Sequence, residues 1–198
     1  MIFGEYLAHD PATPIQLFRH HGRQDWVGDG DLMIANLART MRLAPVPHYM
    51  VWWRINGPSR IDEWEAYFRS PQGRLYQAET AVTHAVRFLQ NGLYDEIIGG
   101  DASPLPPGLH LVEYFSSDTI EADDLRQRYE ARAHAAAAGK LRHVLKRLGM
   151  LAPDPGGVAL WSFASHAEAE PFLRSPVAAD GLTVISRGLY RNFGDDIV

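Results

Sequence analysis

Hydrophobic and polar residues alternate in short blocks along the chain, and these blocks predict strands separated by helices. Segments 2–9 and 109–116 are rich in aromatic and β-branched residues, which is typical of strands. Segment 121–140 is rich in Ala, Arg and Glu and carries acidic residues in its first turn, so it predicts a helix. The matching stretch of the first half, 11–26, predicts a weaker helix.

Two other segments, 32–43 and 141–151, have an ambiguous period that fits either a helix or a strand. We favour strands, because each segment then pairs through a proline-containing turn with the strand that follows it, 48–56 or 157–165. Prolines suit such a turn, since they cannot occupy a central position in a β ladder.

A second helix and a last strand complete each half. The helices are predicted at 59–70 and 165–175, each with its first serine as the N-cap, and the last strands at 86–98 and 182–193. Each half therefore predicts the order β-α-β-β-α-β. This is the ferredoxin-like unit, an antiparallel four-stranded sheet with both helices on one face.

The two halves also share residues in the same order, which predicts a duplication. We expect one unit at 1–98, a Gly- and Pro-rich linker at 99–107 and a second unit at 108–198. Packed sheet to sheet, each unit covers the bare face of the other. The repeated residues, at shifts of 108 and then 96 positions, are Glu5-Tyr6 with Glu113-Tyr114, Trp53 with Trp161, and Gly92-Leu93-Tyr94 with Gly188-Leu189-Tyr190.

This order of elements, with a Trp-bearing strand before a helix that ends in "YFRSP", resembles the dimeric α/β-barrel superfamily. The stretch "LWSFASHAEAEPFLRSP", residues 160–176, is similar to its NIPSNAP and EthD branches. Ordinary members are one unit long and dimerise, so the resemblance implies a fused tandem that forms the barrel within one chain. A homodimer of tandem chains stays an open alternative. The superfamily includes monooxygenases, cyclases and haem proteins, so the resemblance implies a fold rather than one reaction.

Composition narrows the classes of partner. The net charge is −5 and no basic stripe is present, which disfavours nucleic acid. Cysteine is absent, so thiolate metal sites and cysteine nucleophiles are excluded. The sequence has no phosphate-binding loop, dinucleotide fingerprint or histidine pair with metal-ligand spacing, so we predict no metal and no nucleotide cofactor. With no signal peptide and no apolar run of about 20 residues, we expect a cytoplasmic protein without a membrane partner.

Residues that are polar in the first half only are candidates for a single site. His9, His48 and Arg54 are such residues, because the corresponding positions of the second half hold Ser or Gly. The resemblance adds His84, since single-unit members of the cyclase type often place an active-site His in this part of the fold.

The strand 48–56 has two different faces. The face with Trp53 is bulky and suits packing beneath the helices, and we expect Trp161 to be buried in the same way. The other face suits a cavity between the sheets that holds a small aromatic or anionic molecule. It carries His48, Met50, Trp52 and Arg54.

The position of Glu5 depends on which face of its strand meets the helices. If Tyr6 lies beneath the helices, Glu5 and His9 face the space between the sheets, where Glu5 can act as an acid or base. The alternative for both Glu5 and Glu113 is a salt bridge with an arginine across the barrel, and we favour it above all for Glu113. We expect Arg54 to be neutralised by Glu5, by Glu113 or by a bound carboxylate.

These residues support two function classes. The first is a small-molecule enzyme of the cyclase, lyase or monooxygenase type, without a metal or nucleotide cofactor, acting on an aromatic or polyketide-like substrate between the sheets. The alternative is a non-catalytic ligand-binding or assembly module of NIPSNAP type, whose inter-sheet space is filled by side chains. A weaker alternative is a haem protein with one His as axial ligand. In the enzyme, His9, His48 or His84 moves a proton with help from Glu5 or Tyr94, and Arg54, Trp52 and Met50 bind the substrate.

Overall fold

The computed structural model describes residues 1–9, 31–40, 47–75, 78, 86–100, 104–116, 120–148, 155–174 and 182–192. The elements of the first half are β1 (Ile2–His9), β2 (Leu32–Arg39), β3 (Tyr49–Arg54), α1 (Ser59–Arg69) and β4 (Val86–Ile98). Those of the second half are β5 (Gly108–Ser116), α3 (Ala122–Ala135), β6 (Lys140–Arg147), β7 (Gly157–Phe163), α4 (His166–Arg174) and β8 (Thr183–Asn192).

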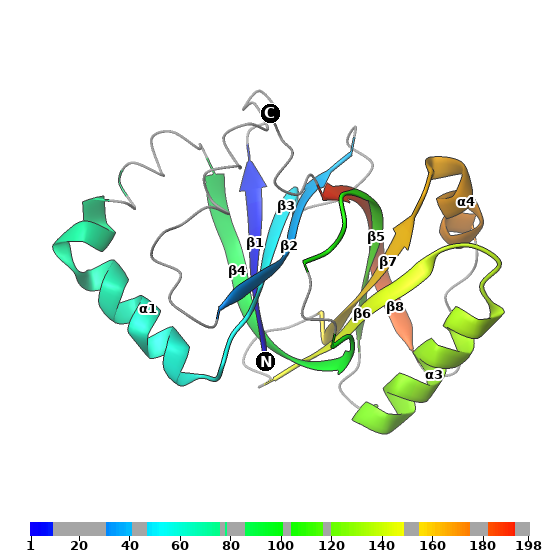
Figure 1. The fold of residues 1–198 in the computed structure, drawn as a ribbon, viewed down its shortest axis with the longest axis horizontal. Helices are drawn as coiled ribbons and strands as arrows, with labels where there is room; N and C mark the ends of the chain where they lie inside the picture. Colours follow the sequence, from blue (N-terminus) through cyan, green and yellow to red (C-terminus); the bar gives the residue numbers. More distant parts are fainter. Residues whose placement is uncertain are drawn as a thin grey trace.

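The described strands form one closed antiparallel barrel in the order β1-β3-β2-β8-β5-β7-β6-β4. The strands of the first half run β4-β1-β3-β2 around it, and those of the second half run β8-β5-β7-β6, which is the same order. Two junctions, β2 with β8 and β4 with β6, close the barrel. Helix α1 lies on one side of the barrel, and α3 and α4 lie on the opposite side (Figure 1). The predicted mixed α+β barrel is thus confirmed.

The segments with an ambiguous period are strands, as predicted, over 32–39 and 140–147. Helix α3 ends at Ala135, earlier than the segment 121–140 predicts. The chain turns at Gly139, whose φ of +86° is left-handed and which lies against the ring of Phe163, so the backbone enters β6 directly. The predicted helix at 11–26 lies outside the described residues.

The two serine N-caps have different outcomes. The Oγ atom of Ser165 accepts a hydrogen bond from the backbone N–H of Glu168, whose carboxylate accepts one from the N–H of Ala164. This cap of α4 is confirmed. The cap predicted at Ser59 is wrong, because the N-cap of α1 is Pro58 and no side chain bonds to that helix end.

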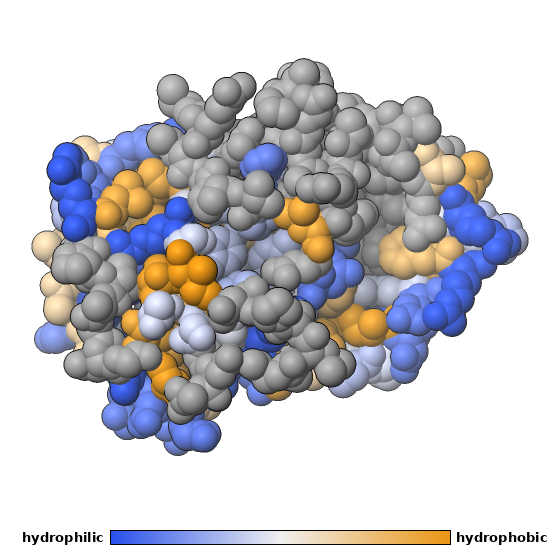
Figure 2. Space-filling view, turned by 180° about the vertical axis from the view of Figure 1, so that it is seen from behind, coloured by the Kyte–Doolittle hydropathy of each residue, from blue (hydrophilic) through white to orange (hydrophobic). Residues whose placement is uncertain are grey.

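Three clusters of buried side chains form the core. One fills the barrel interior, one lies beneath α3 and α4, and one lies beneath α1. Trp161 belongs to the second cluster and Trp53 to the third, and both are buried, so their predicted positions between strands and helices are confirmed. On the face opposite to that of Figure 1, the described hydrophobic residues form separate groups among hydrophilic ones (Figure 2).

None of the described helices combines the length and the apolar composition that crossing a bilayer requires.

Candidate functional site

Strand β1 presents the opposite faces from those expected. Tyr6 points into the barrel, where its hydroxyl donates a hydrogen bond of 2.9 Å to the hydroxyl of Tyr94. Glu5 therefore lies on the outer face, where it accepts a hydrogen bond of 3.0 Å from the indole nitrogen of Trp53. The prediction that Glu5 faces the space between the sheets is wrong. The alternation of residues defines two faces but not which of them meets the helices.

Four tyrosines gather in the barrel interior. The hydroxyls of Tyr6 and Tyr94 form one pair and those of Tyr114 and Tyr190 form a second, 3.2 Å apart. Burial, together with the neighbouring phenols, raises the pKa of Tyr6 and of Tyr114 far above the usual value, and burial also raises the pKa of Tyr94, so these three phenols are neutral. Tyr94, which we expected to help a histidine move a proton, is fully buried and hydrogen-bonded to Tyr6.

The described inward-facing side chains pack against one another. Met50 and Trp52 do face inward, as the pattern of β3 predicts, but both are fully buried within this cluster. The hydroxyl of Tyr114 donates to the sulfur of Met50, and Leu105, from the segment before β5, packs into the same cluster. The described part of the interior is thus lined by side chains that contact each other, which disfavours it as the main ligand site.

Arg54 is neutralised by a residue that the sequence pattern did not suggest. Its guanidinium donates two hydrogen bonds, of 2.8 and 3.0 Å, to the carboxylate of Glu96 on β4. The same carboxylate lies 2.9 Å from the Nδ1 atom of His143 on β6. Burial pushes the pKa of Glu96 up, but the hydrogen bonds from His143 and Arg54 outweigh it and lower that pKa. Neither Glu5 nor Glu113 is the partner of Arg54.

The outer face of the first half carries a polar row across four strands. Glu5 on β1 is in register with Asn91 on β4 and with Val51 on β3, and Val51 is in register with Asn36 on β2. Residues in register point to the same side of an antiparallel sheet. The row Asn91–Glu5–Val51–Asn36 thus places one carboxyl group between two side-chain amides.

The corresponding row of the second half has different chemistry. It consists of Arg187, Glu113, Ala159 and Val144 on β8, β5, β7 and β6. Arginine takes the place of Asn91, and an aliphatic residue takes the place of Asn36. The carboxyl position is thus flanked by a cation and by hydrophobic side chains.

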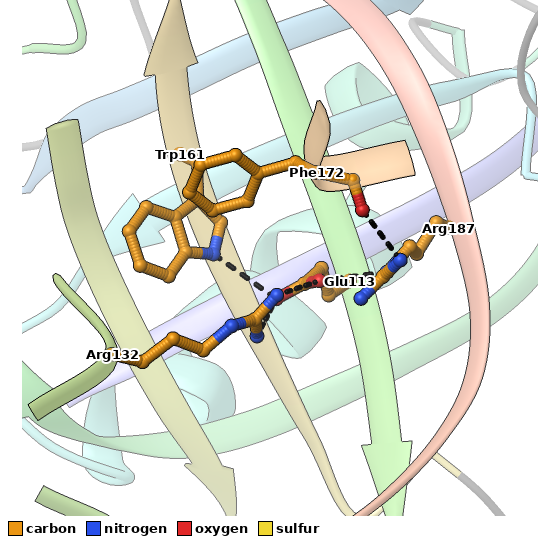
Figure 3. A network of polar contacts seen from close by, with 5 residues as sticks. All are labelled: Glu113, Arg132, Trp161, Phe172 and Arg187. Carbon is orange, nitrogen blue, oxygen red and sulfur yellow. Dashed lines mark hydrogen bonds and ion pairs between the residues drawn. The ribbon is translucent and has the colours of Figure 1, made fainter. Parts of the chain in front are cut away.

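The carboxylate of Glu113 is enclosed by ion pairs (Figure 3). Arg132 of α3 donates to both of its oxygens, at 2.6 and 2.8 Å, and Arg187 lies 2.8 Å from one of them. The indole of Trp161 donates a further hydrogen bond of 3.0 Å, which matches the bond from Trp53 to Glu5. Glu113 is fully buried, and the expected salt bridge is present. The salt bridge lies beneath the helices instead of across the barrel.

Aromatic side chains lie on the same outer face as Glu5. The ring of Trp64 on α1 lies 5.0 Å from that of Phe3 and 6.4 Å from that of Trp53. The hydroxyl of Tyr49 donates a hydrogen bond to the amide oxygen of Asn36. Phe3, Glu5 and Asn36 are only partly buried, in contrast to the closed second half. The outer face of the first half therefore combines a carboxyl group, amides and aromatic rings.

The remaining predicted residues are not brought to one place by the described structure. His48 directly precedes β3 and is partly buried. His9 ends β1, but its side chain lies outside the described residues, as does all of His84. The described residues contain no group of three side chains that could hold a metal ion.

Sequence reasoning missed Asn36, Asn91, Tyr49 and Trp64. A signal was available for two of them, because Asn36 and Asn91 are replaced by Val144 and Arg187 when the halves are aligned. The contribution of Trp64 depends on how α1 packs, which the sequence does not specify.

Comparisons with known proteins support the fold. No family model matches the chain, and no curated protein matches it. Two similar solved structures are an anthrone oxidase-like protein and a putative chlorite dismutase. The first has a TM-score of 0.65 and 8% identity, covering 98% of this chain and 90% of that one. The second has a TM-score of 0.59 and 12% identity, covering 98% and 94%. At these identities the likeness extends to the dimeric α/β-barrel fold and no further.

Proposed function

We propose that this protein is a small-molecule enzyme that uses neither a metal nor a nucleotide cofactor and acts on an aromatic or polyketide-like substrate. Its site is the outer face of the first half, around Glu5, in place of the space between the sheets. We further propose that the chain is a tandem of two ferredoxin-like units related to the NIPSNAP and EthD branches. The equal strand order of the two halves supports this origin.

The observation that carries the proposal is the difference between two matching rows. In the second half, Arg132 and Arg187 neutralise Glu113 and leave its carboxylate no reactive role. In the first half, Asn91 stands where Arg187 stands, so the cation on the neighbouring strand is replaced by a neutral amide. We infer that the carboxylate of Glu5, with the amide of Asn91 beside it in place of a cation, exchanges a proton with the substrate.

The surroundings of Glu5 fit an aromatic substrate. Phe3 is partly buried beside the core rings of Trp53 and Trp64 and supplies a ring for stacking, and the amides of Asn36 and Asn91 supply hydrogen bonds to carbonyl or hydroxyl groups. The carboxylate of Glu5 takes a proton from an acidic C–H or O–H of the substrate and returns it to another atom of the same molecule. Such a proton shift needs no external oxidant. The name of the anthrone oxidase-like neighbour supports the aromatic class.

Ligand binding and turnover test this proposal in the intact chain. We would screen aromatic carboxylic acids and polycyclic aromatic ketones by thermal shift and tryptophan fluorescence, then follow their conversion. Glu5→Gln should retain binding within about threefold and lose turnover by about 100-fold or more, since only the proton acceptor is removed. Asn91→Arg should lose both, because the new cation pairs with Glu5 as Arg187 does with Glu113. Glu130→Gln, an exposed change on α3, is the control.

Full turnover by Glu5→Gln would refute the role of this carboxyl group. Unchanged binding by Asn91→Arg would refute the location of the site.

A second candidate, a non-catalytic module of NIPSNAP type, is favoured by the packing inside the barrel. The described inward-facing residues of this core are at most 4% exposed. This candidate predicts no hit in the ligand screen and no conversion of any compound. The third alternative, haem, predicts a coloured protein with a Soret band that is lost when the axial His is replaced.

A further inference from the structure

A compact polar cluster lies at the barrel end where β5 begins and β7 ends, away from Glu5. The Oγ atom of Ser162 lies 3.0 Å from the Nδ1 atom of His110, and the two residues are in register on neighbouring strands. The other ring nitrogen of His110 lies 3.1 Å from the backbone carbonyl oxygen of Pro106. The Nε atom of Arg142 on β6 donates a hydrogen bond of 2.9 Å to the same Oγ. The carbonyl of Pro106 and the guanidinium of Arg142 thus converge on one hydroxyl–imidazole pair.

The partners fix the direction of each hydrogen bond. A backbone carbonyl only accepts, so the Nε2 atom of His110 carries the hydrogen and donates it to Pro106. The Nδ1 atom of a neutral imidazole then has a free lone pair, which accepts the hydrogen of Ser162. Arg142 only donates, and its charge lies beside the oxygen of Ser162. The hydroxyl is therefore oriented towards a base and next to a cation.

The environment keeps the base neutral. His110 is 1% exposed, whereas Ser162 and Arg142 are partly exposed, so the serine lies on the more open side of the pair and the imidazole is shielded from water. Burial, helped by the charges of Arg142 and His143 and opposed by the bond to Pro106, lowers the pKa of His110 to about 4. A neutral imidazole at physiological pH is the form that accepts a proton.

We propose that Ser162 is a nucleophile activated by His110, and that this barrel end is an acyl-transfer site for small esters, separate from the Glu5 site. The arrangement satisfies the general requirement of such a site, a nucleophile within hydrogen-bond reach of a base that a third group orients. The orienting group is the carbonyl of Pro106. Arg142 stabilises the negative charge that develops next to Oγ.

The proposed reaction needs only the ester and water. The Oγ of Ser162 bonds to the ester carbonyl carbon, and its proton moves to Nδ1 of His110. The bond from that carbon to the alcohol oxygen breaks, and the alcohol leaves with the proton from His110. Water then attacks the acyl group, again passing a proton through His110, and releases the acid and the free serine.

The first half has no equivalent of this pair. Ile2 and Arg54 occupy the strand positions that correspond to His110 and Ser162. The charged groups nearby pair with one another, because Glu96 binds both Arg54 and His143. The hydroxyl–imidazole pair is therefore a property of the second half.

Labelling with a fluorophosphonate probe and hydrolysis of p-nitrophenyl acetate test the proposal in the full chain. The phosphorus should bond to Ser162 with loss of fluoride, giving one adduct per chain that peptide mass spectrometry places on this residue. Ser162→Ala should abolish the adduct and the ester hydrolysis, whereas Ser186→Ala, a change of a partly exposed serine on β8, should leave both unchanged. His110→Gln should slow labelling by about 100-fold or more.

A measurement on the unaltered protein guards against variants that fail to fold. The labelling rate should be nearly constant from pH 8 to pH 6 and should be halved near pH 4, where His110 becomes protonated. Three other groups face His110. They are Arg142 and His143, whose charges help to lower its pKa, and the phenol of Tyr190, which is in register with it. No adduct on folded protein, an adduct on another residue, or a rate that halves near pH 6.5 would overturn the proposal.

Discussion

Glu5 and Glu113 accept the same hydrogen bond from a tryptophan, but their neighbours on the next strand differ. Two arginines surround Glu113, whereas the residue in register with Glu5 is the neutral Asn91. A buried carboxylate with cationic partners stabilises the fold only as long as every partner remains. At the scale of single residues, the charge of the adjacent side chain therefore distinguishes Glu113, which is held by ion pairs, from Glu5, for which we propose a reactive role.

The first prediction concerns Glu113. Glu113→Gln should lower the free energy of unfolding by about 3–5 kcal/mol, because it leaves two buried guanidinium groups without their anion. Urea titration followed by circular dichroism measures the change. Glu5→Gln is the matched control and should cost less than about 1 kcal/mol. Equal losses in both variants would contradict the difference that we draw between the two halves.

The second prediction concerns pH. His110 has a pKa of about 4 in the folded chain and an ordinary value of 6.5 when unfolded. Between these values the unfolded chain binds the proton more readily, so stability is full above pH 6.5 and falls as the pH drops towards 4. The loss from this group is at most about 3 kcal/mol.

Urea titrations at several pH values between 7 and 4 would measure this loss. A variant without the titrating group, His110→Gln, should show a shallower fall in the same window. An equally steep fall in that variant would assign the effect to other residues.

At the scale of elements, the period of hydrophobic residues predicted most strands, including the ambiguous segments that became β2 and β6. It did not predict which face of β1 meets the helices. Both faces of β1 carry large or apolar side chains, Tyr6 on one and Phe3 on the other, so alternation alone does not distinguish them. The packing of the partner strands determines the orientation of β1, and on the outer face Trp53 of β3 donates a hydrogen bond to Glu5. The row of Asn36 and Asn91 could not be assembled without the strand register.

The third prediction tests how α1 is held. Trp53→Ala should destabilise the protein by about 3–5 kcal/mol, as large truncations in cores do, because Trp53 packs against Trp64 of that helix. Thermal or urea unfolding measures the loss. Trp64→Ala should give a loss of similar size if the contact between Trp53 and Trp64 holds the cluster beneath α1 together. A loss below about 1 kcal/mol for Trp53→Ala would place that ring at a surface.

At the scale of the whole molecule, the barrel closes through two junctions that the sequence did not reveal. Strand β2 pairs with β8 over Leu37 to Arg39, and β4 pairs with β6 over Tyr94 to Ile98. We expected two units packed sheet to sheet as a barrel within one chain, and the strand pairs form that barrel as one continuous ladder. Such long-range pairing has no local pattern, because it depends on how the two halves meet.

The segment predicted as a linker supplies the fourth prediction. Leu105 is 4% exposed and packs into the barrel interior, while its backbone carbonyl accepts a hydrogen bond from the amide of Asn192. Leu105→Ala should therefore cost about 2–5 kcal/mol, the range for a buried leucine, whereas a plain connector would tolerate the change. Urea titration measures it, and Pro104→Ala, an exposed change in the same segment, is the control.

Closure of the barrel within one chain affects how its stability depends on protein concentration and how far its two halves can differ. In a barrel built from two identical chains, assembly is bimolecular, so dilution loosens it and every substitution appears twice. Here the halves are tethered, and the transition temperature of the barrel should not change over a hundredfold range of protein concentration. Each half is also free to change alone. One half can hold packing residues and ion pairs where the other half holds polar residues, which symmetry forbids in a homodimer.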